Sequence, residues 1–370
     1  MTLIAHTGAA VFDGARLWGC GVLLTHEGRF VGVGDAVPAG AVVREWSGGT
    51  VLPGFVDLQV NGGGGVLFND APTVATLRVM AQAHRALGTR AFLPTLITDS
   101  FDQTKAAIDA VALARAQGMP GIAGLHLEGP HLALARKGAH DGALIRPMDG
   151  RDLALLCDAV PRVGNLMVTV APESVSAAQI SALHRAGVIV SLGHSDCSYD
   201  DAIAAMAAGA TCVTHLFNAM SGLASRAPGL VGAALEQPVA AGLIADGVHV
   251  HPAVMRAALR AKPVGVFLVS DAMATAGSDI GGFTLNGRQV LRRHGRLTLA
   301  DGTLAGADLT MGQAVGVMVS QVGVPLTRAL AMATSVPAAL LRGFDGVGRF
   351  SPGLPVNAIH IAHDGTVTAV

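Results

Sequence analysis

The feature that most constrains the fold is a repeated alternation of short apolar segments with alanine-rich segments. Most of the apolar runs are followed by a stretch with apolar residues at helical spacing and a glycine after its last turn. Continuous apolar strands that alternate with helices are typical of a parallel sheet covered on both faces. Eight such units predict an α/β fold of the (β/α)8 TIM-barrel type rather than an open sheet. The eight predicted strands are 52–60, 89–97, 121–129, 166–173, 187–194, 211–217, 240–247 and 265–272.

Both ends of the chain lack the helical period. Residues 1–51 and 345–370 consist of short strand-like runs and turns, so we expect them to form one small β-sandwich beside a barrel that spans 52–344. A hairpin-like stretch around 283–306 follows the last predicted barrel strand and is interpreted as an insertion into the barrel domain.

Composition limits the classes of function. Hydrophobic residues make up 51% of the chain and charged residues 14%, which suits a compact enzyme and not a disordered chain. The formal net charge of −1 gives no general attraction to nucleic acid or to an anionic membrane, so neither is an expected partner. The four cysteines have no CxxC spacing and are interpreted as reduced thiols. We recognise no signal peptide and no apolar run long enough to span a membrane, and we therefore expect a cytoplasmic protein.

Polar side chains gather at the predicted carboxyl ends of the strands, where the active sites of such barrels lie. One carboxylate and two histidines on nearby strands, with a further carboxylate on the last strand, are typical of a metal-dependent hydrolase. Three protein ligands leave a position open for water, and the further carboxylate can take and return the proton of that water. The strand-end candidates are Gln59 with Asn61, Thr95, Glu128, Glu173, His194, His215, Asp246 with His249, and Asp271.

Longer motifs carry a resemblance to a known family. They are LPGFVDLQVNG, HLEGPHLALARKGAH, SLGHSD, VTHLFNAM, RAPGL, LIADGVHV and VSDAMATAG, and they run in order from about residue 50 to residue 277. In these motifs the chain resembles the N-acetylglucosamine-6-phosphate deacetylases of the amidohydrolase superfamily. The resemblance implies a metal-dependent enzyme of amino-sugar metabolism that releases acetate from N-acetylglucosamine 6-phosphate, and it implies a homodimer.

The resemblance also implies a role for each matching residue. Glu128, His194 and His215 match the metal ligands, and Asp271 matches the general acid and base. His140 matches the histidine that contacts the acetamide and polarises its carbonyl group. Part of the phosphate site is implied to come from a neighbouring subunit. The residues that match sugar-phosphate contacts are Asn218, Ala219, Arg226 and His249.

The segment DLQVNGGGG departs from the pattern of many amidohydrolases, which carry two metal-binding histidines at the positions of Gln59 and Asn61. Because alternate strand residues share one side, both amides are expected to face the barrel mouth. Amides are poorer ligands for Zn²⁺ than imidazoles, but they can hydrogen-bond a substrate. None of the three lysines, Lys105, Lys137 and Lys262, ends a predicted strand, so a carboxylated lysine is not expected. We therefore predict one divalent metal per subunit, Zn²⁺ first with Fe²⁺, Co²⁺ or Mn²⁺ as alternatives, and substrate contacts by both amides.

Several simpler interpretations stay open. The Gly62–Gly65 run lacks the GK[ST] ending of a phosphate-binding loop and is interpreted as a tight turn close to the site. Without the resemblance, Arg226 would be interpreted as a solvated surface arginine, and His251 could replace His249 as the inward histidine. His126 is interpreted as a buried supporting histidine rather than a ligand.

Three other functions also stay open. A related amidohydrolase could act on N-acetylgalactosamine 6-phosphate, or on a cyclic amide or a nucleobase. A barrel without catalytic activity could serve as a binding module, although the candidate ligands and the acid/base are all present.

Overall fold

The structure of the protein is a computed structural model that describes residues 2–370. Its centre is an eight-stranded parallel sheet with the order β17-β16-β15-β14-β13-β12-β11-β8. A bridge between Val60 and Ala272 joins the two outer strands, so the sheet closes and the predicted (β/α)8 barrel is confirmed. Each strand lies within its predicted range: β8 (Phe55–Val60), β11 (Thr89–Ile97), β12 (Leu125–Glu128), β13 (Leu166–Val170), β14 (Ile189–Leu192), β15 (Cys212–Val213), β16 (Ala240–Ile244) and β17 (Val266–Val269).

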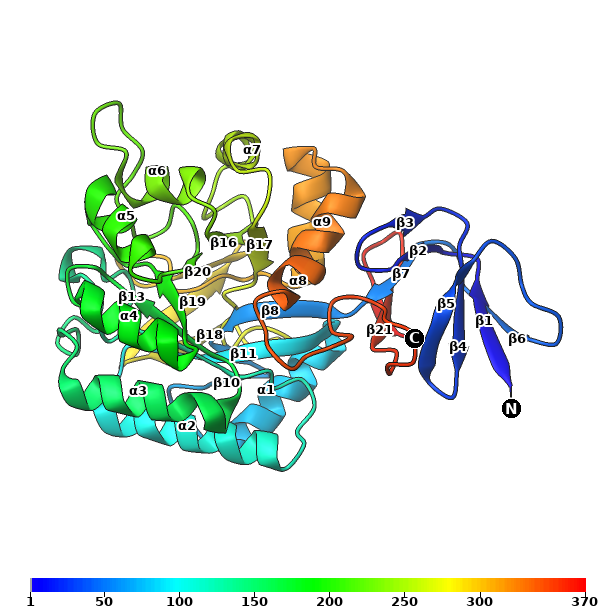
Figure 1. The fold of residues 1–370 in the computed structure, drawn as a ribbon, viewed down its shortest axis with the longest axis horizontal. Coiled ribbons are helices and arrows are strands. Elements are labelled where there is room, and N and C mark those ends of the chain that lie inside the picture. Colours follow the sequence, from blue (N-terminus) through cyan, green and yellow to red (C-terminus); the bar gives the residue numbers. More distant parts are fainter. Residues whose placement is uncertain (1) are drawn as a thin grey trace.

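A helix follows each barrel strand and covers the outside of the barrel (Figure 1). Polar caps start many of these helices; the side chains of Thr73, Ser100 and Asp149, for example, accept hydrogen bonds from first-turn backbone N–H groups. The eight helices are α1 (Val74–Ala86), α2 (Phe101–Ala116), α3 (Gly150–Val163), α4 (Ala177–Ala186), α5 (Tyr199–Ala207), α6 (Gly229–Glu236), α7 (Pro252–Ala261) and α8 (Met311–Val317). After α8 come a π-helical turn (Met318–Val322), α9 (Leu326–Ala333) and α10 (Ser335–Ala338).

Strands from both ends of the chain lie together beside the barrel (Figure 1). One sheet has the order β22-β21-β7-β2-β3, and a second has the order β5-β4-β1-β6. Leu23 and Phe30 of the second sheet share a buried cluster with Val11, Val51 and Ala358 of the first, so the sheets pack face to face. The strands are β1 (Leu3–Thr7), β2 (Ala10–Phe12), β3 (Leu17–Trp18), β4 (Val22–His26), β5 (Arg29–Gly34), β6 (Val42–Glu45), β7 (Thr50–Pro53), β21 (Ala358–Ile361) and β22 (Val367–Ala369).

Two short β elements cover the mouth of the barrel. The first is a hairpin of β9 (Gly62–Gly63) and β10 (Val66–Leu67) directly after β8. The second is a three-stranded antiparallel sheet between β17 and α8, made of β18 (Gly282–Leu285), β19 (Arg288–Arg293) and β20 (Arg296–Thr298). The two elements share one buried apolar cluster, which therefore encloses the region next to the end of β17. Among residues 2–370, no helix combines the length and the apolar character that a membrane crossing needs.

Candidate active site

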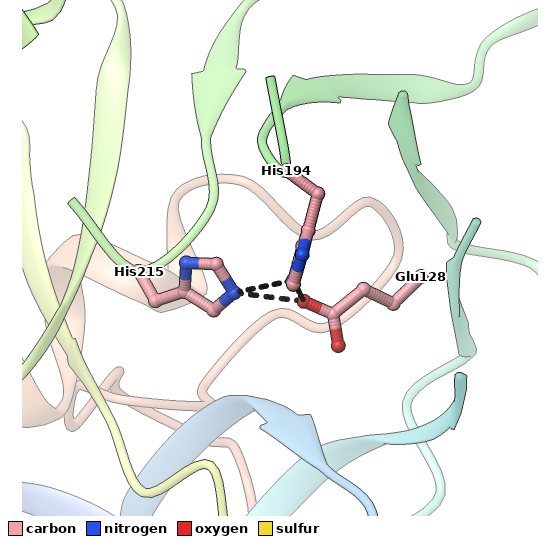
Figure 2. Close-up of side chains that lie close together, drawn as sticks. All are labelled: Glu128, His194 and His215. Atoms are coloured by element: carbon pink, nitrogen blue, oxygen red, sulfur yellow. Dashed lines mark hydrogen bonds and ion pairs between the residues drawn. The ribbon is translucent and has the colours of Figure 1, made fainter. Parts of the chain in front are cut away.

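Three side chains converge at the carboxyl ends of the barrel strands (Figure 2). Glu128 ends β12, His194 follows β14, and His215 follows β15. Glu128 Oε1 lies 3.2 Å from His194 Nε2 and 2.9 Å from His215 Nε2, and the two nitrogen atoms are 3.1 Å apart. All three side chains are buried, so the structure brings the predicted metal ligands together in one enclosed cluster. We call Glu128, His194 and His215 the triad.

The spacing of these atoms fits a divalent cation. Donors held tetrahedrally at about 2.0–2.1 Å from a Zn²⁺ ion are about 3.3 Å from one another. The observed separations of 2.9–3.2 Å are close to that value. His194 Nδ1 lies 2.8 Å from the carbonyl oxygen of Arg136, which can only accept, so Nδ1 donates and Nε2 is the ring nitrogen that faces Glu128 and is available to a metal.

Burial and contact set the charge state of this cluster. Burial by itself would raise the pKa of Glu128, but the hydrogen bonds with His194 and His215 outweigh it and hold the pKa well below its usual value. Burial would likewise lower the pKa of His215, yet the contact with Glu128 raises it above its usual value. A cation must therefore compete with protons for these nitrogen atoms, and metal affinity is expected to fall at acidic pH.

Two histidines of the cluster, and the neighbouring Asp271, have strained backbones. His194, His215 and Asp271 have φ angles of 48°, 29° and 49°, in the left-handed region that costs non-glycine residues about 1–3 kcal/mol each. Glu173 braces one of them, because its carboxylate accepts hydrogen bonds from Ser195 Oγ and from the next backbone N–H, both at 2.7 Å. Glu173, a strand-end candidate from the sequence, thus supports the loop that carries His194 and is not part of the triad.

Asp271 lies next to the triad and is held by two amides. Asn61 Nδ2 donates to Asp271 Oδ1 at 2.7 Å, and Gln59 Nε2 donates to the same oxygen at 3.2 Å. Gln59 Nε2 also lies 3.2 Å and 3.3 Å from the two carboxylate oxygens of Glu128. Both amides therefore turn N–H groups toward carboxylates. Burial, and then the nearby charge of Glu128, raise the pKa of Asp271 to about 6, a value suited to a group that accepts and returns a proton near neutral pH.

His140 lies beside the triad, with Nε2 4.0 Å from Glu128 Oε2. The backbone N–H of Thr98 lies 3.3 Å from His140 Nδ1 and can only donate, so Nδ1 accepts and the ring proton is on Nε2. Thr98 Oγ1 lies 2.7 Å from the same Nδ1. Burial lowers the pKa of His140 well below its usual value, so the ring is neutral. His140 is therefore arranged as an Nε2–H donor at the site.

Two residues that the sequence analysis did not single out hold parts of the site in place. Thr98, which orients His140, follows the end of β11, and its position just past a strand end was the available signal. Asp57 accepts hydrogen bonds from Ser270 N at 3.2 Å and from Ser270 Oγ, directly before Asp271. The two-residue period of β8 was the signal for Asp57, because it places this carboxylate on the same side as Gln59.

The hydroxyl group of the candidate Thr95 is buried inside the barrel and makes its contacts there, away from the triad. Its Oγ1 accepts a hydrogen bond from Val60 N at 2.9 Å and lies 3.3 Å from His126 Nδ1. His126 Nε2 in turn lies 2.7 Å from Thr169 Oγ1, and burial lowers the pKa of His126 to about 4. These contacts agree with the interpretation of His126 as a neutral supporting histidine.

A cavity of about 390 Å³ opens above the triad and Asp271. Leu285 and Leu304, from the region of the β18–β20 sheet, line part of its wall. Gln59 is buried against the two carboxylates rather than on the cavity wall, and Arg226 lies exposed in the loop 221–228, outside the cavity of its own chain. The other residues predicted to contact substrate do line the cavity: Asn61, His140, Asn218, Ala219 and His249.

The Gly62–Gly65 run fastens the start of the barrel to its end. The backbone N–H groups of Gly62, Gly64 and Gly65 donate to carbonyl oxygens within residues 272–276, the segment that follows Asp271, at 2.7–3.1 Å. A Cβ at Gly62 would lie 2.4 Å from the carbonyl oxygen of Val66 and 2.8 Å from a backbone nitrogen of that segment. The interpretation as a tight turn agrees with these contacts, and the close approach explains the glycines.

We expect Gly62→Ala to lower the free energy of unfolding by about 1–3 kcal/mol, because the added methyl group must push two backbone segments apart. The same shift displaces Asp271, so turnover is expected to fall as well. Thermal melting and steady-state kinetics measure the two effects. Gly281→Ala is the matched control, since its Cβ meets no atom within 4 Å. Equal behaviour of the two variants would contradict the role of Gly62.

Comparison with known proteins shows which enzyme family the chain belongs to. A model of the amidohydrolase family matches residues 50–370. A crystal structure of N-acetylglucosamine-6-phosphate deacetylase from Pasteurella multocida has a TM-score of 0.94 and 34% identity, and the match covers 100% of this chain and 98% of that one. The chain therefore belongs to the amidohydrolase family.

Two curated relatives narrow the group. N-acetylgalactosamine-6-phosphate deacetylase of Shewanella sp. (strain ANA-3) is 40% identical, over 97% of this chain and 94% of the relative. N-acetylglucosamine-6-phosphate deacetylase of Haemophilus influenzae is 36% identical, over 84% and 82%. These matches confirm the resemblance to the N-acetylglucosamine-6-phosphate deacetylases that the motifs indicated. The protein is a hydrolase of the deacetylase type.

Proposed function

We propose that the protein hydrolyses the acetamide of N-acetylglucosamine 6-phosphate to acetate and glucosamine 6-phosphate, in amino-sugar catabolism. The observation that carries the proposal is that Asp271, His140 and the Glu128–His194–His215 cluster border one cavity. An acid/base, an N–H donor and a candidate metal site are the groups that amide hydrolysis needs. Relatives at 34% and 36% identity that are named N-acetylglucosamine-6-phosphate deacetylases support the choice of substrate.

The residues act in order on the substrate. A divalent cation at the triad, Zn²⁺ first with Fe²⁺, Co²⁺ or Mn²⁺ as alternatives, would supply a water of lowered pKa. Asp271 accepts a proton from the water while the water oxygen attacks the acetamide carbon. His140 Nε2–H donates to the oxyanion that develops on the acetamide oxygen. Asp271 then gives its proton to the amine nitrogen as the C–N bond breaks.

The phosphate is proposed to bind on the side of the cavity formed by Asn218, Ala219 and His249. Arg226 is proposed to reach this group from a second subunit, because it lies on an exposed loop and a guanidinium can bind phosphate through two hydrogen bonds. The neighbouring Leu223 is 62% exposed and would be covered in such a dimer. A homodimer in the cytoplasm is therefore part of the proposal, and the four free cysteines are compatible with a reducing compartment.

The test is acetate release by purified, metal-analysed protein, with N-acetylglucosamine 6-phosphate and unphosphorylated N-acetylglucosamine compared side by side. We expect a strong preference for the phosphorylated sugar and about one metal ion per chain. Activity on neither sugar, with metal bound, would show that the substrate is wrong.

N-acetylgalactosamine 6-phosphate is the second candidate substrate. It is favoured by the 40% identity to the Shewanella deacetylase over 97% of this chain. The two sugars differ only in the configuration at C4, so the ratio of kcat/KM for the two epimers decides between them. A ratio above one for the galactosamine form would make it the main substrate and would leave the site residues and their roles unchanged.

A further inference from the structure

A second carboxylate–histidine pair borders the substrate cavity and takes no part in the proton transfers described above. His249 Nδ1 lies 2.6 Å from Asp246 Oδ2. The side chains are 8% and 6% exposed, respectively. Both residues follow β16, whereas the triad comes from β12, β14 and β15. His249 lines the cavity, while Asp246 lies behind it.

Asp246 is held rigidly against His249. Its Oδ1 accepts hydrogen bonds from the backbone N–H groups of Val248 and His249, both at 2.8 Å. Burial would raise the pKa of Asp246, but the hydrogen bonds from His249 and Val248 lower it below its usual value, so this side chain is a carboxylate. A carboxylate can only accept, and therefore His249 Nδ1 carries a proton that is committed to Asp246.

The other ring nitrogen of His249 is left for a ligand. No residue in 2–370 hydrogen-bonds Nε2, and this atom is not sealed from the cavity. Arg136, the arginine on the cavity wall, is already paired with Asp196 at 2.7 Å. A phosphate monoester entering this cavity therefore finds His249 as a cation-forming side chain of the same chain whose outer nitrogen has no other partner.

We propose that Asp246 is a positioning residue that makes His249 bind the substrate phosphate as an imidazolium, with Nδ1–H on the carboxylate and Nε2–H on a phosphate oxygen. The reason is the fixed proton on Nδ1. A neutral ring with that proton would present a lone pair from Nε2 to an anion, which repels it. The doubly protonated ring lies between two anions, and each of them stabilises its charge. This inference rests on the proposed function, because it assumes a phosphorylated substrate.

Asp246→Asn tests the proposal with little change in shape. The Asn carbonyl oxygen still accepts the two backbone N–H groups, but the amide N–H₂ group faces Nδ1 and removes the carboxylate that holds the charge. We expect KM for the sugar phosphate, and the inhibition constant of inorganic phosphate, to rise about 10-fold or more, since a charge-assisted hydrogen bond is replaced by a neutral one. The value of kcat is expected to change much less than KM.

Two further measurements separate positioning from a structural role. His249→Gln keeps an N–H donor without charge, and the double variant Asp246→Asn/His249→Gln is expected to match His249→Gln alone, because Asp246 acts only through the imidazole. In the wild-type protein with glucosamine 6-phosphate bound, ¹⁵N NMR at neutral pH is expected to show both nitrogens of His249 protonated.

Three outcomes would overturn the proposal: an unprotonated Nε2 in the NMR experiment, additive effects in the double variant, or an unchanged phosphate inhibition constant in Asp246→Asn. Failure of the proposed function would look different. In that case the wild-type protein itself would show no preference for the phosphorylated sugar, whatever the variants do.

Discussion

Replacement of Asp271 by Asn is expected to lower turnover by about 10³-fold or more, within the range that general acid–base groups contribute. The Asn side chain keeps the size of Asp271 and can still accept the hydrogen bonds from Asn61 and Gln59. It cannot take a proton from the attacking water or return one to the amine. Bound metal is expected to stay at the wild-type amount, because Asp271 lies outside the Glu128–His194–His215 cluster.

The pH dependence supplies a second readout for the same residue. Asp271 works as a base only when it is deprotonated, and burial together with Glu128 raises its pKa to about 6. A bound cation pulls this pKa down, so wild-type kcat/KM is expected to fall as the pH drops below about 6. With the metal held in excess, so that acid does not empty the site, the residual activity of Asp271→Asn should lack this acidic limb. Asp301→Asn, which makes the same change at an exposed position, is the control and should behave as wild type. Near-normal turnover of Asp271→Asn would refute its role as acid and base.

Loss of the metal is expected to have an effect of similar size. A catalytic cation supplies several kcal/mol of transition-state stabilisation, which corresponds to about 10³-fold or more in rate. Chelation of the wild-type protein should therefore abolish acetate release, and added Zn²⁺ should restore it. Glu128→Gln should bind metal poorly and stay inactive after addition, because Glu128 Oε1 is the atom shared by both histidines and the Gln side chain lacks its charge.

Metal analysis and activity on the same samples check this prediction. Glu45→Gln, at an exposed position on β6, makes the same chemical change far from the cluster in sequence and should keep both metal and activity. Full metal occupancy in Glu128→Gln would show that the cation is held elsewhere. Full activity of the chelated protein would remove the metal from the proposed reaction.

The sequence predicted the barrel because the patterns that indicate strands and helices are local in the chain. Each apolar run and each following helix is determined by neighbouring residues, and each of the eight strands lies within its predicted range. The strand ends then indicated Glu128, His194, His215 and Asp271, because parallel strands in one barrel end at the same face. The family motifs added His140, which lies in a loop without a helical or strand period that could place it.

Other parts of the site depend on contacts between distant segments. Asn61 and Gln59 were predicted to face the barrel mouth, but only the three-dimensional arrangement shows their N–H groups turned toward Asp271 and Glu128, which are at least 69 residues away in sequence. Thr98 orients His140 from 42 residues away, and no local pattern reports such a pair. A hydrogen bond between segments leaves no periodic trace in either of them.

By itself, then, the sequence determined the eight-stranded barrel and the family, and it predicted which polar residues end the barrel strands, because periodicity and contiguous motifs are properties of the chain in one dimension. The tertiary structure decided which of those residues meet. It joined Glu128, His194 and His215 in one cluster, placed Asp246 behind His249, and left Arg226 outside the cavity of its own chain. The physical reason is that proton positions, pKa shifts and metal geometry depend on distances of a few ångströms, and folding alone sets those distances.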